Sequence, residues 1–163
     1  LSKRKTKSAS LLCVNSQLDE IGVESEIHKI IKTLENDNFT TTIRTTKESA
    51  LNDGGSILLF SKDSGSIIGS DCLITKNNLE SVGPTLVQNF LKYNQSVDNH
   101  LSDMLVVPAS MADGVSVFKV SEITKHLETN LYVTSKITNT RYGIGKLNDG
   151  YEVRINGDSS TRV

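Results

Sequence analysis

The sequence predicts an α+β fold made of two small lobes, each with helices packed on a sheet. Apolar residues recur at helical spacing in four segments, and short strand-like runs bounded by turn residues fill most of the rest. With 163 residues, 36% apolar and 23% charged, the composition is ordinary for a globular protein. We expect residues 1–96 to form a β-α-β-β-β-α domain and residues 97–163 to form an α-β-α-β-β domain.

The first lobe is predicted from one strong helical stripe and the strand-like runs around it. Apolar residues at helical spacing predict a helix, with the stripe Val23, Ile27, Ile30, Ile31 and Leu34. Strands are expected over residues 9–14, 39–46, 57–60 and 66–73. A second amphipathic helix carries Leu79, Val82, Leu86 and Phe90.

The second lobe begins with a helix over residues 97–107, which we expect Pro108 to end because proline lacks a backbone donor. Residues 115–120 alternate like a half-buried strand, and Ser121 is the expected N-cap of a helix carrying Ile123, Leu127 and Leu131. Two closing strands, 141–146 and 151–155, flank the hairpin turn at Asn148-Asp149-Gly150.

Charge and cysteine content narrow the class of protein. Basic and acidic residues number 18 and 19, so nonspecific coating of nucleic acid is not expected, and any RNA contact would be local. The one basic cluster, Lys3-Arg4-Lys5 with Lys7, is interpreted as a solvated tail. Cys13 and Cys72 are two separate thiols, and no apolar run approaches the roughly 18 residues of a membrane span. We therefore expect a cytoplasmic protein with no membrane segment.

Few residues carry recognisable chemistry. The chain has no phosphate-binding glycine loop, serine nucleophile elbow or metal-binding histidine pair, so we predict no metal ligands within it. His28 is interpreted as an exposed helical histidine. His126 lies on a predicted helix beside Leu127, where polar side chains at positions i+3 and i+4 could hold one ring nitrogen and leave the other as a nucleophile. A lone helical histidine beside an apolar stripe is usually structural, so the pattern alone does not select it.

Several short sequence motifs, in a fixed order along the chain, add to the evidence for His126. The later blocks are His100-Leu101-Ser102-Asp103, then Phe118-Lys119-Val120, then Ser121 and His126-Leu127-Glu128-Thr129-Asn130. Upstream lie Gly69-Ser70-Asp71-Cys72-Leu73 and Glu80-Ser81-Val82-Gly83. Together, across residues 8–142, they resemble the C-terminal half of the RNA 3′-terminal phosphate cyclase family.

The resemblance implies a fold and assigns each part of the chain to one domain of that fold. Cyclases are built of repeated βαβαββ core units with a smaller inserted domain. Residues 1–96 are similar to that insert, and residues 97–163 are similar to the end of the last core repeat. The earlier repeats are not in this chain, and we expect them to act as a partner, in cis or in trans. A homo-oligomer is left open.

The resemblance also implies a reaction. His126 would attack the α-phosphorus of ATP to give a histidine-AMP, which passes AMP to an RNA 3′-phosphate before the neighbouring 2′-hydroxyl closes a 2′,3′-cyclic phosphate. The adenylate pocket would be lined by His100, Leu101, Ser102, Asp103 and Met104. The expected cofactors are ATP and a divalent metal, Mg²⁺ or Mn²⁺, and the expected partner is RNA with a 3′-phosphate end.

The chain departs from the family pattern at a few positions. Met104 stands where a glutamine is usual, Glu128 where a leucine is common, and Ile74-Thr75-Lys76-Asn77 replaces a glycine-rich stretch. The alternatives are a non-catalytic cyclase-like scaffold in RNA processing or ribosome biogenesis, and a stand-alone interaction module. Scaffold relatives lack the histidine, so His126 favours the enzyme.

Overall fold

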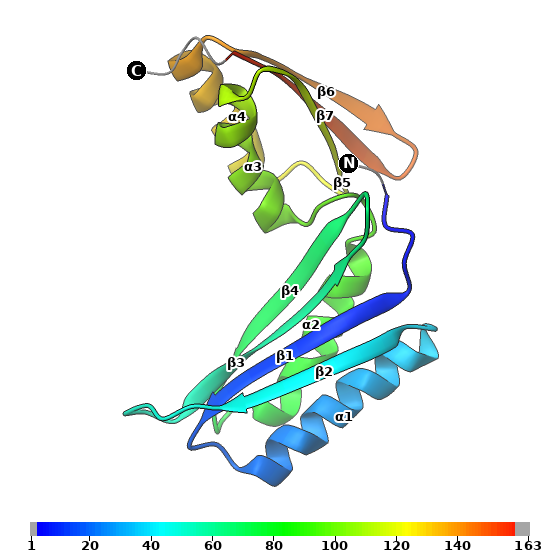
Figure 1. Ribbon diagram of the computed structural model, residues 1–163, viewed down its shortest axis with the longest axis vertical. Coiled ribbons are helices and arrows are strands. Elements are labelled where there is room, and N and C mark those ends of the chain that lie inside the picture. Colours follow the sequence, from blue (N-terminus) through cyan, green and yellow to red (C-terminus); the bar gives the residue numbers. More distant parts are fainter. Residues whose placement is uncertain (1–2, 159–163) are drawn as a thin grey trace. The chain divides into compact units, whose positions relative to one another are not determined.

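The computed structural model describes residues 3–158 of the chain. It contains two compact units, each made of helices and one sheet, which confirms the α+β class (Figure 1). The first, here called the α1–α2 unit, comprises residues 5–63 and 69–92. The second, the α3–α4 unit, comprises residues 3–4, 64–68 and 93–158.

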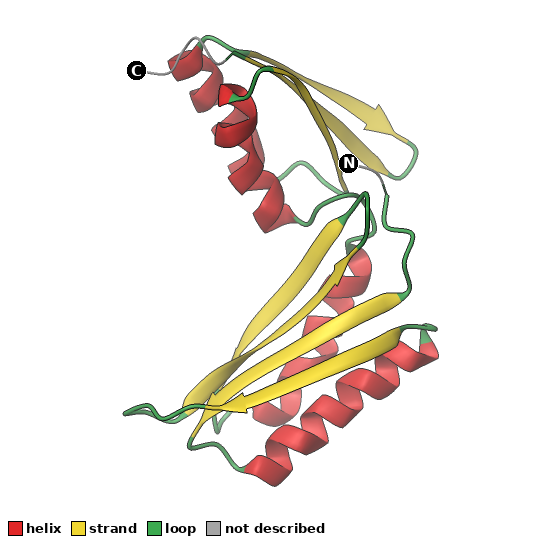
Figure 2. Ribbon diagram, viewed as in Figure 1, coloured by secondary structure: helices red, strands yellow, loops and turns green. Residues whose placement is uncertain are grey.

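The α1–α2 unit has the predicted order β-α-β-β-β-α. Its elements are β1 (Ser8–Ser16), α1 (Glu20–Asn36), β2 (Thr40–Lys47), β3 (Gly54–Lys62), β4 (Ile67–Ile74), the short 3₁₀ helix η1 (Leu79–Ser81) and α2 (Val82–Lys92). The sheet order is β2-β1-β3-β4, with β1 parallel to β2 and antiparallel to β3. Both helices lie on one side of this sheet (Figure 2). The parallel β1-α1-β2 connection places the ends of β1 and β2 beside the start of α1.

The predicted helical stripe is the buried face of α1. Val23, Ile27, Ile30 and Leu34 are all buried, while Asp19 caps the helix by accepting the N–H of Gly22 at 2.8 Å. On β1, Ala9, Leu11 and Cys13 are buried at alternate positions, so one face of the strand points to the helices.

The start of α2 is held by a buried side chain of α1. Glu26 is 1% exposed, and its Oε1 accepts the N–H of Gly83 at 2.9 Å. Its Oε2 accepts from Lys29 at 3.0 Å. A Cβ at position 83 would lie 2.6 Å from Oε1, which explains a glycine there. Gly83, in the block Glu80–Gly83, therefore has a structural role in this unit.

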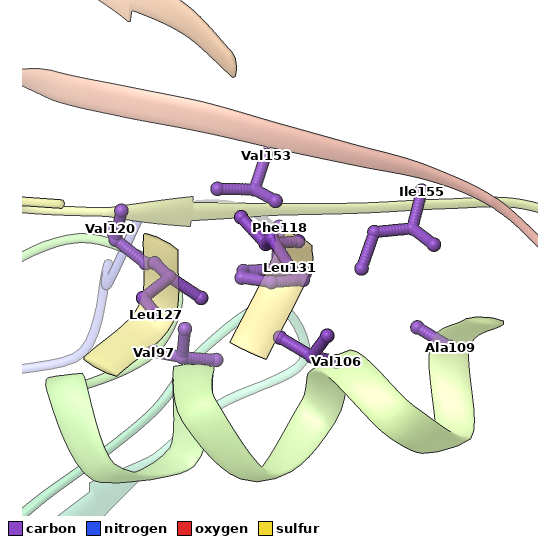
Figure 3. Packing of buried hydrophobic residues seen from close by; sticks show 9 residues of the cluster. All are labelled: Val97, Val106, Ala109, Phe118, Val120, Leu127, Leu131, Val153 and Ile155. Carbon is purple, nitrogen blue, oxygen red and sulfur yellow. The ribbon is translucent and has the colours of Figure 1, made fainter. Parts of the chain in front are cut away.

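The α3–α4 unit has the predicted order α-β-α-β-β. Its elements are α3 (Asn99–Met111), β5 (Gly114–Val120), α4 (Lys125–Thr138), β6 (Arg141–Leu147) and β7 (Gly150–Gly157). Both β5 and β6 pair antiparallel with the central β7. The core is one aliphatic cluster with a single aromatic ring (Figure 3), formed by Val97, Val106, Ala109, Phe118, Val120, Leu127, Leu131, Val153 and Ile155.

Two sequence-based expectations about this unit are wrong. Thr124, and not Ser121, is the N-cap of α4, and its hydroxyl accepts the N–H of Leu127 at 3.0 Å. Because α4 begins at Lys125, the capping residue must directly precede it. Helix α3 also continues through Pro108 to Met111. Proline removes the bond to the carbonyl of Met104, whose side chain is on the exposed side of the helix, where water can replace that bond.

The first described residues belong to the α3–α4 unit and are not a free tail. The N–H of Arg4 donates to the carbonyl of Gln95 at 3.2 Å, and Lys3 pairs with Asp149 in the β6–β7 turn. Within residues 3–158, no helix has the length and hydropathy to cross a membrane.

Candidate functional site

Helices α3 and α4 bring three of the predicted site residues together. Asp103 follows His100 by three residues on α3, so the two share one side of the helix. Helix α4 packs against α3 and carries His126 as its second residue. Figure 3 shows Val106 of α3 and Leu127 and Leu131 of α4 in one buried cluster, so both helices pack on the same core.

A second contact ties the beginnings of the two helices. The side-chain amide of Asn99, the first residue of α3, donates to Glu122 Oε1 at 2.7 Å. Glu122 lies in the loop that leads into α4. No local pattern marks this pair, because the two residues are 23 positions apart and meet only after both helices have packed. The pair keeps His100 and His126 at the same end of the helix pair.

Asp103 is the most unusual group in this pair of helices. Its Oδ1 is buried and has no hydrogen-bond partner among the described residues. Burial raises the pKa of the Asp103 carboxyl above its ordinary value, while His126 and His100 act in the opposite direction. Both imidazoles therefore lie close enough to influence the carboxylate. A partly buried carboxylate beside two imidazoles is typical of a site for acid–base or nucleophilic chemistry.

His126 is exposed at the start of α4. The first turn of a helix presents unpaired N–H groups and a positive dipole end, an environment that favours an anionic ligand such as a phosphate. The expected hydrogen bonds from Thr129 and Asn130 to the ring are not found among residues 3–158. The ring thus has room for an external partner.

The other predicted pocket residues divide between two sides of α3. Met104, four residues after His100, is 74% exposed on the same side as His100 and Asp103. Leu101 packs against the core of the unit. Ser102 is 1% exposed, and its hydroxyl donates to the carbonyl of Asn99 at 2.7 Å. The structure therefore groups His100, Asp103 and Met104 and turns Leu101 and Ser102 inward.

Ser121 has a different position from the one expected. Its Oγ is buried and has no hydrogen-bond partner among the described residues, because Thr124 takes the capping role. A buried hydroxyl without a partner, five residues before His126, is a polar group open to an additional contact. Sequence reasoning treated Ser121 as a cap and so missed this.

A resident metal does not fit the residues of the helix pair. In the described part of the chain, no three His, Cys, Asp or Glu side chains come together to hold an ion. No step is therefore assigned to a metal held by this chain.

Comparison with known proteins places these helices in a family. Residues 11–144 match the family RNA 3′-terminal phosphate cyclase. A protein of that name from Methanococcoides burtonii is 30% identical over 140 residues, which is 86% of this chain and 42% of the relative. The protein of the same name from Pyrobaculum aerophilum is 29% identical over 116 residues, 68% of this chain and 33% of the relative.

A third relative, from Methanopyrus kandleri, is 35% identical over 96 residues, or 55% of this chain and 27% of its own length. The chain thus spans well under half the length of the curated relatives it matches. The matched range includes the α1–α2 unit from Leu11 onward, both helices of the site and most of β6. This chain belongs to the RNA 3′-terminal phosphate cyclase family.

Proposed function

We propose that this chain supplies the adenylate-accepting histidine of an RNA 3′-terminal phosphate cyclase, and that His126 is that residue. The observation that carries the proposal is the Asp103 carboxylate, with its buried and unpartnered Oδ1, close to the exposed ring of His126. In an ordinary structural helix pair, a buried carboxylate oxygen has a partner. Here the missing partner is assigned to the adenylate or to the imidazole that receives it.

The proposed reaction divides one difficult step into easier ones. A neutral ring nitrogen of His126 attacks the α-phosphorus of ATP, the bond to the β-phosphate oxygen breaks, and pyrophosphate leaves. The RNA 3′-phosphate then displaces the histidine and takes the AMP. Finally the 2′-hydroxyl attacks the phosphorus of the RNA 3′-phosphate, loses its proton and expels AMP, leaving a 2′,3′-cyclic phosphate.

Asp103 has a positioning role in this proposal. An ionised carboxylate beside an imidazole favours the protonated ring, and a neutral carboxyl does not. Because burial raises the pKa of Asp103, the carboxyl can accept a proton more easily than an exposed aspartate. Met104 and His100, on the same side of α3, are proposed to line the adenine or ribose. Leu101 and Ser102 would support the helix from within the core.

The remaining parts of the active site are proposed to come from outside this chain. Stabilising the charge that develops on the phosphates needs cationic or N–H donors. The start of α4 supplies N–H groups and the cation Lys125, but α3 and the first turn of α4 carry no arginine for bidentate contacts to phosphate. We propose that a segment like the earlier cyclase repeats, in the same or a second chain, provides these groups. A divalent metal, Mg²⁺ or Mn²⁺, would arrive with the ATP phosphates. A cytoplasmic location and an RNA partner belong to the same proposal.

The experiment is incubation of the chain with ATP labelled at the α-phosphate and a divalent metal, with and without an N-terminal cyclase segment. We expect protein-bound label that is lost in acid and stable in base, as a phosphoramidate is. His126→Ala should abolish it. His28→Ala is the matched control, because His28 is also an exposed helical histidine but lies on α1 in the other unit.

The outcomes separate the enzyme from the non-catalytic scaffold. Label that persists in His126→Ala would show that another residue is the nucleophile. Complete absence of label with the N-terminal segment present, together with retained RNA binding, would favour the scaffold. Label in the wild type and in His28→Ala but not in His126→Ala would support the enzyme.

A further inference from the structure

A small cavity lies in the α1–α2 unit, where the parallel strands β1 and β2 end and α1 begins. It has a volume of about 180 Å³ and is lined by Asn15, Glu20, Val23, Glu24, Thr45 and Lys47. The carboxyl ends of parallel strands are a recurrent position for ligands in α/β units. All six residues belong to one unit, and the inference below does not rest on the proposed function.

Asn15 is the reason to expect a ligand here. Its side chain is on the helix-facing side of β1, with Leu11 and Cys13, and is 4% exposed. Burial raises the pKa of the Cys13 thiol, and a hydrogen bond with the Asn15 side chain lowers it. Oδ1 has no hydrogen-bond partner among the described residues. The cavity therefore has a buried acceptor that needs a donor.

The charges around the cavity indicate what kind of donor would fit. Lys47 Nζ contacts Glu20 Oε1 at 2.5 Å, so those two charges compensate each other. Glu24 has no ion pair within residues 3–158. Thr45 is next to Cys13 in the parallel ladder and adds a hydroxyl. The carboxylate of Asp19 caps the start of α1 and offsets the positive end of the helix dipole. The lining side chains therefore leave one net negative charge and several oxygen acceptors, which favours a cation that donates hydrogen bonds.

We propose that this cavity binds the ammonium group of a small aliphatic amine. An –NH₃⁺ group has three donors, which match Asn15 Oδ1, the Glu24 carboxylate and the Thr45 hydroxyl. Val23 provides an apolar wall for the first methylene groups. A divalent metal fits less well, because the described residues contain no group of three His, Cys, Asp or Glu side chains that could hold one.

The test is a titration of the ¹⁵N-labelled 163-residue chain with n-butylammonium chloride at constant ionic strength, followed by NMR. Saturable shifts should appear at the Asn15 side-chain amide and at the backbone amides of Glu20, Glu24 and Thr45. Tetramethylammonium is the control ligand, because it has the same charge and no N–H donor. Equal shifts with both ions would reduce the site to general electrostatics and overturn the proposal, and so would the absence of any saturable shift.

Variants locate the binding group. Glu24→Gln should weaken n-butylammonium binding by about threefold to fivefold, as expected for a partly solvated charge pair. Glu35→Gln, on the exposed side of the same helix, should leave it unchanged. Asn15→Leu should abolish binding, and Asn15→Asp, which has the same shape and an added charge, should strengthen it even where the leucine variant folds poorly. Equal affinity in Glu24→Gln and Asn15→Asp would overturn the proposal.

Discussion

Glu26 in the α1–α2 unit and Asp103 in the α3–α4 unit both have a buried carboxylate oxygen, but the hydrogen bonding of the two differs. In the α1–α2 unit, Glu26 is 1% exposed and both of its oxygens are used, one by the N–H of Gly83 and one by Lys29. In the α3–α4 unit, Asp103 Oδ1 is buried without a partner among the described residues. One carboxylate completes a fold, and the other is left open beside two histidines.

The difference in hydrogen bonding distinguishes a buried carboxylate with a structural role from one with a functional role. A buried charge with all its hydrogen bonds made stabilises the native arrangement, because removing it leaves other groups without partners. A buried oxygen without partners lowers stability and persists when another requirement holds it in place. Substitutions at the two carboxylates should therefore have opposite effects on stability.

The largest effect is expected at Glu26. Glu26→Leu leaves the N–H of Gly83 and the ammonium of Lys29 without their partner, and should lower the free energy of unfolding by about 3 kcal/mol. Hydrogen–deuterium exchange followed by mass spectrometry should show faster exchange in α1 and α2. All four tyrosines lie at or beyond residue 93, so tyrosine fluorescence should report an unchanged α3–α4 unit. Glu26→Gln retains an acceptor and should cost less. An equal loss in both variants would contradict the role given to the Gly83 bond.

Gly83→Ala tests the same contact from the other side. The added Cβ would lie 2.6 Å from Glu26 Oε1, so the carboxylate must move and the free energy of unfolding should fall by about 2 kcal/mol. Urea unfolding followed by hydrogen exchange in α1 and α2 measures this. Gly143→Ala is the control, because a Cβ there meets nothing within 4 Å. Equal stability of Gly83→Ala and the wild type would show that Glu26 adjusts freely.

A smaller effect is expected at the start of α4, just before His126. Thr124→Ala removes the cap on the N–H of Leu127 and should cost about 1 kcal/mol, measured by urea unfolding with tyrosine fluorescence. Ser121→Ala should be neutral or slightly stabilising, since the Ser121 hydroxyl has no partner among the described residues. A larger loss of stability in Ser121→Ala than in Thr124→Ala would show that Ser121 caps α4.

The elements of both units could be predicted from the sequence because their signals are local. The stripe from Val23 to Leu34 and the turn at Asn148–Gly150 depend on neighbours within a few residues. The error at Ser121 arose because several residues suited to capping lie close together and the pattern does not fix where the helix begins.

The candidate site, unlike the helices and strands, could not be predicted from local sequence patterns. The helical pattern alone did not select His126, and the cyclase resemblance did. Neither source indicated the open oxygen of Asp103, the Asn99–Glu122 contact or the bond between Glu26 and Gly83. The last two join residues 23 and 57 positions apart, and all three depend on tertiary packing that periodicity does not encode.

The smallest change in stability, and the most informative, is expected at Asp103. Burial raises its pKa in the folded protein above the ordinary 3.8, so the folded state holds more protons than the unfolded state between those two values. The stability of the wild type should therefore fall as pH rises through that window and then level off. Asp103→Asn should remove this pH dependence and, at pH 7, be as stable as the wild type or slightly more stable.

In the Asp103→Asn variant, adenylylation of His126 should fall by about tenfold to a hundredfold, the loss expected for one hydrogen bond to a charged group. Urea midpoints across pH, alongside the labelled-ATP assay, measure both. A clear loss of stability of Asp103→Asn at pH 7, with normal adenylylation, would contradict the proposal. It would show that Asp103 has a structural role like that of Glu26, and the contrast between the two units would disappear.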